Sequence, residues 1–390
     1  MSEENKEIKT PSPYEEESRL RRKRMRRKNT ISYIVSLLAV VVGLFVIMIL
    51  AIALYSWIDS KTAETEALLQ QTMGDAQTAE EITYTQEQLD QKIAEAVAQA
   101  QAEDAQALEN ALNAQREEIL GGISGQLTEG QTVVETLRPF YPDDVVLVSG
   151  GKFHFLPIRE ELAQHNYVQE NLQVLENGRY AYVEDGQVTS HMGIDVSKYQ
   201  GSIDWEKVAA EGVEFAFLRV GLRGYSSGRI VEDDSFETNI QGALRNGIKV
   251  GVYFFSQATT EEEAIEEANF VLEKIAPYQV ECPVVFDVEK VSDSTARMNQ
   301  LTPQERTNVT IAFLDTIEAA GYQSMFYHNM ETALLLLELD RLEDYDRWFA
   351  YYGEEFYYPY QYSVWQYSEK GRIDGIDADV DLNIAFKMWE

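Results

Sequence analysis

Cysteine is almost absent from this 390-residue chain, in which Cys282 is the only one. A single cysteine excludes an intrachain disulfide, and it excludes a zinc finger or ribbon, which needs several cysteine or histidine ligands at fixed spacing. The histidines show no metal-ligand spacing either; they are His154, His165, His191 and His328. If the protein is exported, its stability must therefore come from its core alone.

Basic residues are also scarce, since 33 Lys and Arg stand against 66 Asp and Glu and the formal net charge is -33. Eight of these 33 residues lie between Arg19 and Lys28, so the remaining chain is even more acidic. Nucleic-acid binding needs clustered Lys and Arg on one face, and the composition argues against it. The length suits two folded parts with connecting segments better than one core.

Charged residues are missing altogether from residues 31–58, which are rich in Ile, Leu, Val and Ala. About 20 apolar residues are enough to span a bilayer as a helix. The basic cluster comes directly before this run and acidic residues follow it, a pattern that keeps the N-terminus in the cytoplasm. We therefore expect a cytoplasmic basic tail over residues 1–30 and one transmembrane helix over 31–58. A cleaved signal peptide is the alternative, but its apolar region would be shorter.

Residues 59–130 are predicted to form a helical stalk, because they are rich in Ala, Gln and Glu and contain no proline. A capping box at Thr85–Gln88 predicts a helix that runs to about Leu120, where two glycines would end it. Apolar residues lie loosely on one stripe of this helix: Leu89, Ile93, Val97, Ala100, Leu108, Leu112 and Ile119. The stalk is either a solvated spacer or a coiled coil that forms a homodimer.

Residues 131–190 are predicted to form a small β-rich subdomain. Residues 145–148 and 152–155 indicate two strands around a Gly-Gly turn, and Asn177-Gly178 is typical of a hairpin turn. Asp185-Gly186 indicates a further turn. This segment carries no recognisable chemistry, and wall binding, contact with the following domain and plain spacing all stay open as its role.

Residues 191–390 change to short apolar strands that alternate with amphipathic helices. Helix starts are indicated by Asp204, Thr260 and Thr302, and Gly212, Gly247 and Gly321 mark helix ends. Eight strands are predicted: Gly193–Val196, Phe215–Val220, Lys249–Phe255, Val284–Val288, Ser324–Tyr327, Arg347–Ala350, Ser363–Tyr367 and Val380–Ile384. This order predicts an α/β fold, an irregular TIM-like (β/α) barrel of parallel strands whose later helices are short or missing.

Four acidic residues mark the predicted strand ends at which such barrels carry their chemistry: Asp195, Asp287, Glu289 and Asp381. Asp287 and Glu289 come from Phe-Asp-Val-Glu, and residues i and i+2 of a strand face the same way. Two close, desolvated carboxyl groups raise each other's pKa, so one can stay protonated at neutral pH as a general acid. Glycoside hydrolysis needs such a pair.

Aromatic residues follow the same strand ends and suit a glycan, because the C–H faces of sugars stack on aromatic rings. The candidates for substrate binding are Tyr199, Tyr253, Phe255, Tyr327, Trp348, Tyr351, Trp365 and Tyr367, together with Gln366. For each ring, and for Trp348 and Trp365 in particular, a place in the hydrophobic core is the alternative.

Several ordered motifs now resemble one family. The segments GIDVSKYQGSIDWEKVAAEGVEFAFLRVG, GVYFFS, PVVFDVEK, RWFAYYG, VWQYS and DADVDLN are similar to glycoside hydrolase family 25, the lysozymes that are N-acetylmuramidases. The resemblance covers about 200 residues and leaves out the stalk and the segment before Ser190. It implies an irregular β/α barrel that cleaves the bond between N-acetylmuramic acid and N-acetylglucosamine in peptidoglycan.

The resemblance also implies residue roles. Glu289 looks like the general acid, and Asp287 like the residue that orients the 2-acetamido group of the substrate if the reaction is substrate-assisted. Asp195 and Asp381 look like the other two acids, and Trp365, Gln366 and Tyr367 match a segment that lines the cleft. Tyr253-Phe254-Phe255 departs from the Tyr-His-Phe of many members. No metal or organic cofactor is implied.

The sequence therefore predicts a muramidase held at the outer face of a cell membrane, with peptidoglycan strands and the bilayer as partners. Two other classes stay open. The barrel could be a non-catalytic glycan-binding module, or the chain could be an envelope scaffold whose stalk and middle segment recruit partners. The process that the tethered enzyme would serve is not indicated by any residue.

Overall fold

The computed structural model describes residues 84–389. The expected transmembrane segment, residues 31–58, lies outside the described residues, and so does the basic tail. No helix within residues 84–389 has the length and apolar character needed to cross a bilayer. A division between Leu112 and Asn113 separates two units, so that residues 131–190 belong to the same unit as the barrel. The finer five-part division stays a prediction.

The stalk residues form one helix, α2, over Gln86–Thr128. Its start confirms the capping box, in which the backbone N–H of Thr85 donates to the Gln88 side chain at 2.9 Å. The predicted end at about Leu120 was wrong, because α2 continues through Gly121 and Gly122 and ends at Thr128. Glycine weakens a helix interior by only about 1 kcal/mol, which the flanking turns can tolerate. Gly130, with φ +95°, follows the true end.

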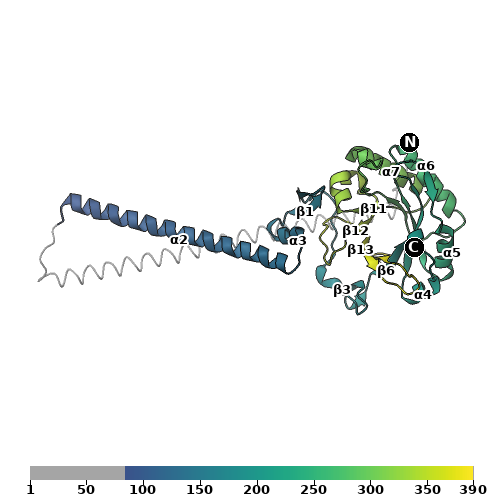
Figure 1. Ribbon diagram of the computed structural model, residues 1–390, viewed down its shortest axis with the longest axis horizontal. Helices are drawn as coiled ribbons and strands as arrows, with labels where there is room; N and C mark the ends of the chain where they lie inside the picture. The colour runs from purple at the N-terminus through teal and green to yellow at the C-terminus, as the bar shows by residue number, and fades with distance from the viewer. Residues whose placement is uncertain (1–83, 390) are drawn as a thin grey trace, which may run out of the picture. The chain divides into compact units, whose positions relative to one another are not determined.

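All eight predicted barrel strands are present. They are β6 (His191–Val196), β7 (Phe215–Arg223), β9 (Lys249–Phe255), β10 (Val284–Asp287), β11 (Ser324–Asn329), β12 (Asp346–Ala350), β13 (Val364–Gly371) and β14 (Val380–Ala385). Their order is β6-β14-β13-β12-β11-β10-β9-β7, and a pairing of β6 with β7 closes the ring (Figure 1). A short strand missed by the sequence analysis, β8 (Ile230–Glu232), pairs with β7.

The barrel is not wholly parallel, which corrects the prediction. Strand β14 runs antiparallel to both of its neighbours, β13 and β6. Only eight residues, 372–379, connect β13 to β14. A parallel return needs a crossover of a dozen or more residues, so the chain can only turn back on itself here. The N-terminal end of β14 therefore lies at the end of the barrel where the other seven strands finish, which we call the mouth.

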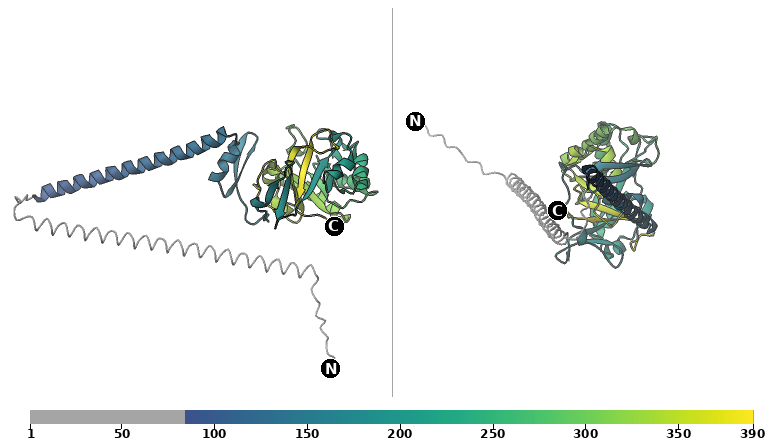
Figure 2. Two further views of the ribbon diagram at one scale, coloured as in Figure 1. Left: turned by 90° about the horizontal axis from the view of Figure 1, so that it is seen from below. Right: turned by 90° about the vertical axis from the view of Figure 1, so that its left-hand side faces the viewer.

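Four helices cover the outside of the first half of the barrel: α4 (Trp205–Ala210), α5 (Phe236–Arg245), α6 (Glu261–Ile275) and α7 (Pro303–Ala319) (Figures 1 and 2). The predicted caps are confirmed, since the side chains of Asp204, Thr260 and Thr302 accept backbone N–H groups at their starts. After β11 there are only a π-helical turn (Thr332–Leu336) and a 3-10 turn (Leu339–Leu342), which confirms the irregular later half.

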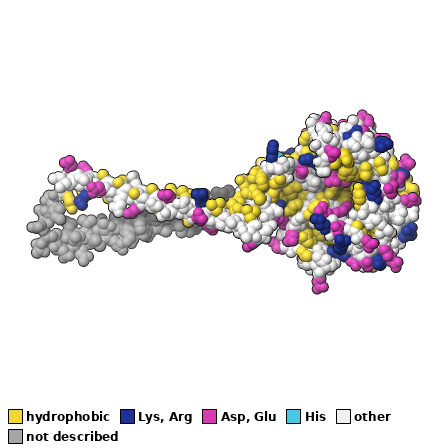
Figure 3. Space-filling view, in the orientation of Figure 1, with side chains coloured by type: hydrophobic (Ala, Val, Ile, Leu, Met, Phe, Trp, Pro, Cys, Tyr) yellow, Lys and Arg dark blue, Asp and Glu magenta, His cyan; other side chains and the backbone are white. Residues whose placement is uncertain are grey.

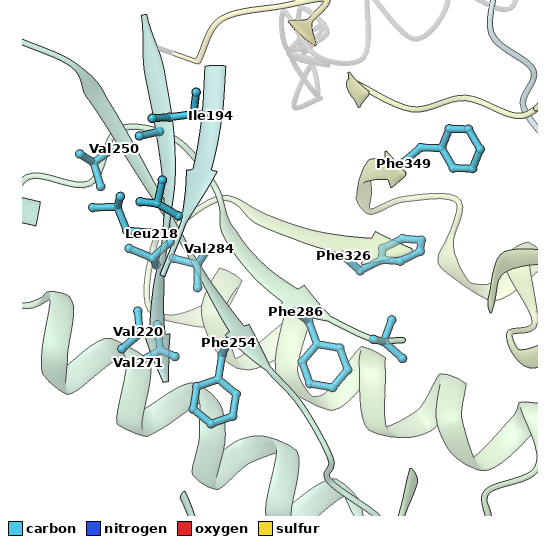
Figure 4. Close-up of a cluster of buried hydrophobic side chains, with 14 of the residues drawn as sticks. Ile194, Leu218, Val220, Val250, Phe254, Val271, Val284, Phe286, Phe326 and Phe349 are labelled. Atoms are coloured by element: carbon cyan, nitrogen blue, oxygen red, sulfur yellow. The ribbon is translucent and has the colours of Figure 1, made fainter. Parts of the chain in front are cut away.

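Successive side chains of each barrel strand point alternately outward and inward, so the barrel has one hydrophobic core under its helices and another in its interior. In β7, Ala216, Leu218 and Val220 belong to the layer between strands and helices, which Figure 4 shows with Phe254 and Phe286. Phe215 and Phe217 belong to the interior cluster with Trp348 and Met325. Gly193 and Gly251 leave room for these two rings, since a Cβ there would lie 2.2 Å and 2.4 Å from them. The interior is therefore packed below the mouth.

Residues 131–190 contain two small sheets, and their status as a separate subdomain stays a prediction. One is the hairpin of β1 (Asp144–Ser149) and β2 (Lys152–Pro157), which follows α3 (Val133–Leu137). The other contains β3 (Leu172–Val174), β4 (Tyr180–Glu184) and β5 (Gln187–Val188). The turns at Gly150-Gly151, Asn177-Gly178 and Asp185-Gly186 are confirmed. Leu162, Tyr167 and Tyr180 pack against the barrel core, so contact with the barrel is one role of this segment.

Short 3-10 turns complete the described part of the chain. They are Arg138–Phe140, Gln169–Asn171, Lys198–Gln200 and Met298–Gln300.

Candidate active site

A cavity of about 650 Å³ opens at the mouth of the barrel. Its lining combines acids, one arginine pair and aromatic rings: Asp195, Tyr199, Arg219, Leu222, Arg223, Gly224, Tyr225, Ser226, Tyr253, Phe255, Asp287, Glu289, Tyr327, Trp348, Tyr352, Gln366, Glu369 and Asp381. All four acids expected from the sequence line this one cavity. A pocket of this size takes a small molecule or a few sugar rings.

The four acids reach the cavity from three strands. Asp195 is the fifth residue of β6, Asp287 is the last residue of β10, and Glu289 follows it by two positions. Asp381 is the second residue of β14, so it lies at the beginning of its strand and not at the C-terminal end that was predicted. Because β14 is antiparallel, Asp381 becomes the direct cross-strand partner of Asp195.

A hydrogen-bond network fixes the Asp195 carboxylate. Its Oδ2 accepts from Gln366 Nε2 and from Asn383 Nδ2, each at 2.8 Å. The Gln366 Oε1 accepts from the hydroxyls of Tyr327 (2.8 Å) and Tyr352 (2.9 Å). Two donors at Oε1 leave the amide N–H₂ only one orientation, toward Asp195.

Asn383 is fixed in the same way as Gln366. Its Oδ1 accepts from Trp348 Nε1 at 2.8 Å, so its amide nitrogen also points at Asp195. Asp195 therefore receives two oriented N–H donors, which favour its ionised form.

Burial raises the pKa of all four acids, but to different extents. The pKa of Asp195 rises to about 6, because the two amide donors limit the effect of burial. Burial and the charge of Asp195 raise the pKa of Glu289 to about 7 and that of Asp381 to about 9. For Asp287, burial and then the charges of Glu289 and Asp195 raise the pKa well above its ordinary value. At neutral pH Asp195 is therefore mostly ionised, Glu289 is partly protonated and Asp381 is protonated.

Asp287 has a free acceptor. Among the described residues its Oδ1 is buried without a hydrogen-bond partner. A buried acceptor of this kind is costly unless a ligand or water satisfies it. Oδ1 of Asp287 is thus available to an N–H group of a bound molecule.

Arg219 brings positive charge to the acids. Strand β7 directs it inward two residues beyond Phe217, and its guanidinium pairs with Asp233 at 2.6 Å. Asp233 also accepts from the backbone N–H of Lys198, which places the exposed ring of Tyr199 over Arg219 at 5.0 Å. The ion pair of Arg219 and Asp233 therefore holds one wall of the cavity in place.

The structure separates the predicted substrate-binding residues into two groups. Tyr199, Tyr253, Phe255, Tyr327, Trp348 and Gln366 line the cavity. Tyr351, Trp365 and Tyr367 do not, which corrects the prediction. Since Gln366 points inward, period-two alternation turns its neighbours Trp365 and Tyr367 outward, where they pack with Tyr180. Tyr351 is bound through its hydroxyl to Arg138 instead.

Sequence analysis missed Arg219, Asn383 and Tyr352. Alternation could have found the first two, since Arg219 follows Phe215 and Phe217 at even spacing and Asn383 follows Asp381. Tyr352 lies in the loop after β12, where no periodic pattern indicates the direction of its side chain.

Within the described residues, no group of three or more His, Cys, Asp or Glu is arranged to hold a metal ion.

Comparison with known proteins agrees with this site. Residues 194–376 match the sequence model of Glycosyl hydrolases family 25. The C-terminal half of the chain is a family 25 glycosyl hydrolase domain. The chain therefore carries a glycoside hydrolase of the lysozyme type.

Similar proteins match about half to three fifths of the chain. The uncharacterized protein YegX of Escherichia coli (strain K12) is 27% identical over an alignment of 214 residues that covers 49% of this chain and 68% of YegX. The autolytic lysozyme of Clostridium acetobutylicum is 26% identical over 199 residues, 49% of this chain and 54% of that protein. The structure of the autolysin LytC from Streptococcus pneumoniae has a TM-score of 0.46 at 22% identity, over 61% of this chain and 57% of that one.

Proposed function

We propose that the family 25 domain cleaves the bond between N-acetylmuramic acid and N-acetylglucosamine in peptidoglycan. The observation that carries this proposal is the convergence of four acids with raised pKa values in one aromatic-walled cavity. A general acid must hold its proton at neutral pH, and a second group must stabilise the oxocarbenium-like centre.

Glu289 is the general acid of this proposal. Its pKa of about 7 leaves it partly protonated at neutral pH, and it lines the open cavity. It donates its proton to the glycosidic oxygen as the bond to the anomeric carbon breaks. Asp287 presents its unpartnered Oδ1 to the N–H of the 2-acetamido group and orients that group for substrate-assisted attack.

Asp195 supplies negative charge beside the developing oxocarbenium centre. Its two amide donors keep it ionised, while Asp381, with a pKa of about 9, stays protonated. The remaining aromatic rings that line the cavity, among them Tyr199 and Tyr352, offer stacking surfaces to the sugar rings.

The experiment that tests this function is digestion of purified peptidoglycan by the full chain in detergent, followed by reduction and mass spectrometry of the fragments. We expect muropeptides that end in reduced N-acetylmuramic acid. Fragments that end in reduced N-acetylglucosamine would overturn the proposed bond specificity. Retention on the wall without any released fragment would assign a glycan-binding module instead.

We also propose that residues 31–58 anchor the protein in the cell membrane, with the N-terminus in the cytoplasm and the enzyme outside, where it remodels the wall within reach of its stalk. Support comes from the apolar run and the basic cluster before it. Alkaline phosphatase fused after the last residue should be active in cells and inactive when residues 31–58 are deleted. Activity that survives this deletion would argue against the anchor.

The rate of cleavage should depend on pH as a narrow bell. It should rise as pH increases through about 6, because Asp195 loses its proton, and fall through about 7, because Glu289 loses its proton. The measurement is kcat/KM from about pH 4 to about pH 9 at constant ionic strength. A rate that keeps rising above pH 8 would contradict the assignment of Glu289 as the acid.

Replacing Tyr352 by Phe should lower kcat about 2- to 10-fold, the equivalent of one neutral hydrogen bond. The variant removes a donor from Gln366 Oε1 and loosens the orientation of the amide that donates to Asp195. Tyr351→Phe is the matched control, because the Tyr351 hydroxyl contacts Arg138 and not Gln366. Equal losses in both variants would show that the network is not the cause.

A further inference from the structure

Helix α2 has a hydrophobic face without a partner in the described part of the chain. None of its 43 residues is buried. Most of its large aliphatic side chains are nevertheless about half exposed, from 40% for Ile119 to 62% for Leu108, and Ile123 is less exposed than these. Figure 3 shows hydrophobic side chains at the surface along the helix, among acidic ones. In proteins most helical stability comes from packing of an apolar face rather than from helix propensity, so an exposed apolar face of this length favours a partner.

The apolar residues of α2 follow one regular series of steps. The series, which we call the α2 stripe, is Leu89, Ile93, Val97, Ala100, Asp104, Leu108, Leu112, Gln115, Ile119, Ile123 and Leu127. Its ten steps span 38 residues, a mean of 3.8 residues per step, and only Asp104 and Gln115 are polar. Its last two members, Ile123 and Leu127, belong to the helix because α2 continues past Gly121.

A step of 3.8 residues is longer than the 3.6 residues of a helical turn. The stripe therefore winds about half a turn round a straight helix between Leu89 and Leu127. A flat protein surface can cover only part of such a stripe. A helix with the same repeat can follow all of it if the two helices supercoil, and repeats longer than 3.6 residues give a right-handed supercoil.

We propose that α2 pairs along the α2 stripe with α2 of a second copy of this chain, in a parallel right-handed coiled coil. A second copy has the required repeat because it has the same sequence. The parallel direction rests on the proposed function, since two copies anchored by residues 31–58 in one membrane enter the stalk from the same side.

The charges of α2 are compatible with this pairing but weaken it. Eight acidic residues stand against Lys92 and Arg116, and seven of these acids lie off the stripe. Asp104 lies on it, and in parallel register it faces its own copy. A polar residue on such a stripe fixes the register at a cost in stability. Asp104→Leu should therefore strengthen the dimer, and added salt should strengthen it by screening the acidic flanks.

Disulfide formation between introduced cysteines tests this geometry, because the only native cysteine, Cys282, is buried. Eight steps of 3.5 residues from Leu89 arrive at Glu117, as in a left-handed coiled coil, whereas the α2 stripe arrives at Ile119. Glu117 and Ile119 are both exposed and point to opposite sides of the helix. Ile119→Cys and Glu117→Cys therefore differ only in the side of the helix that carries the thiol, and they form a matched pair.

The two full-length variants are oxidised mildly in native membranes and their covalent dimers are measured. We expect Ile119→Cys to give at least about ten times more dimer than Glu117→Cys, because only paired stripe positions bring Cβ atoms within about 4.5 Å. More dimer from Glu117→Cys, or equal amounts, would overturn the right-handed repeat. No dimer from either would overturn parallel pairing.

A second measurement separates this proposal from the proposed activity. Leu108→Asp combined with Leu112→Asp should convert a dimeric full chain in detergent to a monomer by light scattering, while peptidoglycan cleavage per chain stays unchanged. An unchanged mass would overturn self-association through the stripe whether or not cleavage is observed. Absence of peptidoglycan cleavage by the wild-type chain would overturn only the proposed muramidase activity.

Discussion

Glu289→Gln is expected to lower kcat for peptidoglycan cleavage about 10²- to 10⁴-fold, the usual contribution of a general acid. The amide is nearly the same size as the carboxyl group, so the fold should be retained. It cannot, however, transfer a proton to the glycosidic oxygen. Since burial and Asp195 raise the pKa of Glu289 to about 7, a substantial fraction of the wild-type group is protonated at neutral pH and can act as the acid. The measurement is release of soluble muropeptides under single-turnover conditions.

Asp293→Asn is the control for this variant. It makes the same change of charge in the loop that follows β10, but Asp293 is exposed and does not line the cavity. Its kcat should equal that of the wild type. If Glu289→Gln and Asp293→Asn were equally active, Glu289 would not be the acid, and the proton donor would have to be sought at Asp287 or Asp381.

Arg223→Met is expected to lower the free energy of unfolding by about 3–5 kcal/mol, as breaking one side of a buried ion pair commonly does. Arg223 Nε donates to Glu267 Oε1 at 2.6 Å, and the Glu267 side chain is completely buried. The same guanidinium donates to Glu266 and to the carbonyl of Gly228, which holds the loop over residues 224–229 against the cavity. Chemical denaturation followed by tryptophan fluorescence measures the loss.

The loss should increase with pH. Burial already raises the pKa of Glu267 to about 7 with Arg223 present, above its unfolded-state value of 4.5. Wild type and variant both lose stability above about pH 4.5, because the unfolded state releases the Glu267 proton there. The difference between them therefore grows only above about pH 7, where Glu267 ionises beside Arg223 but stays protonated without it. Arg223→Met with Glu267→Met removes both charges and should recover at least half of the loss. A double variant as unstable as the single one would show that the unpaired charge is not the cause.

Most of the barrel could be predicted from the sequence because its signals are local. Strand β10 begins with the apolar residues Val284, Val285 and Phe286, and capping boxes such as that at Thr302 mark helix starts by hydrogen bonds within one turn. The predicted end of α2 also rested on a local signal, and there the prediction was wrong. Gly121 and Gly122 are a local stop signal, but a helix that is already formed continues through them.

The site was predicted in part. Acids at strand ends are conspicuous, and all four converge. Proximity to a strand end and a matching motif do not fix the direction of a side chain, which alternates along a strand. Trp365 and Tyr367 therefore point away from the cavity, whereas Asn383 donates to Asp195. Tyr352 could not have been found, because its direction depends on how the loop after β12 folds over the mouth.

The sequence by itself determined the order of strands and helices, the acids at the strand ends, and the repeat along the stalk, since each depends on neighbours within a few turns. Only the tertiary structure decided that β14 runs backward and pairs Asp381 with Asp195. That direction is set by ring closure with a short connection, which no local pattern contains. The same closure buries the acids together, and burial is what raises their pKa values.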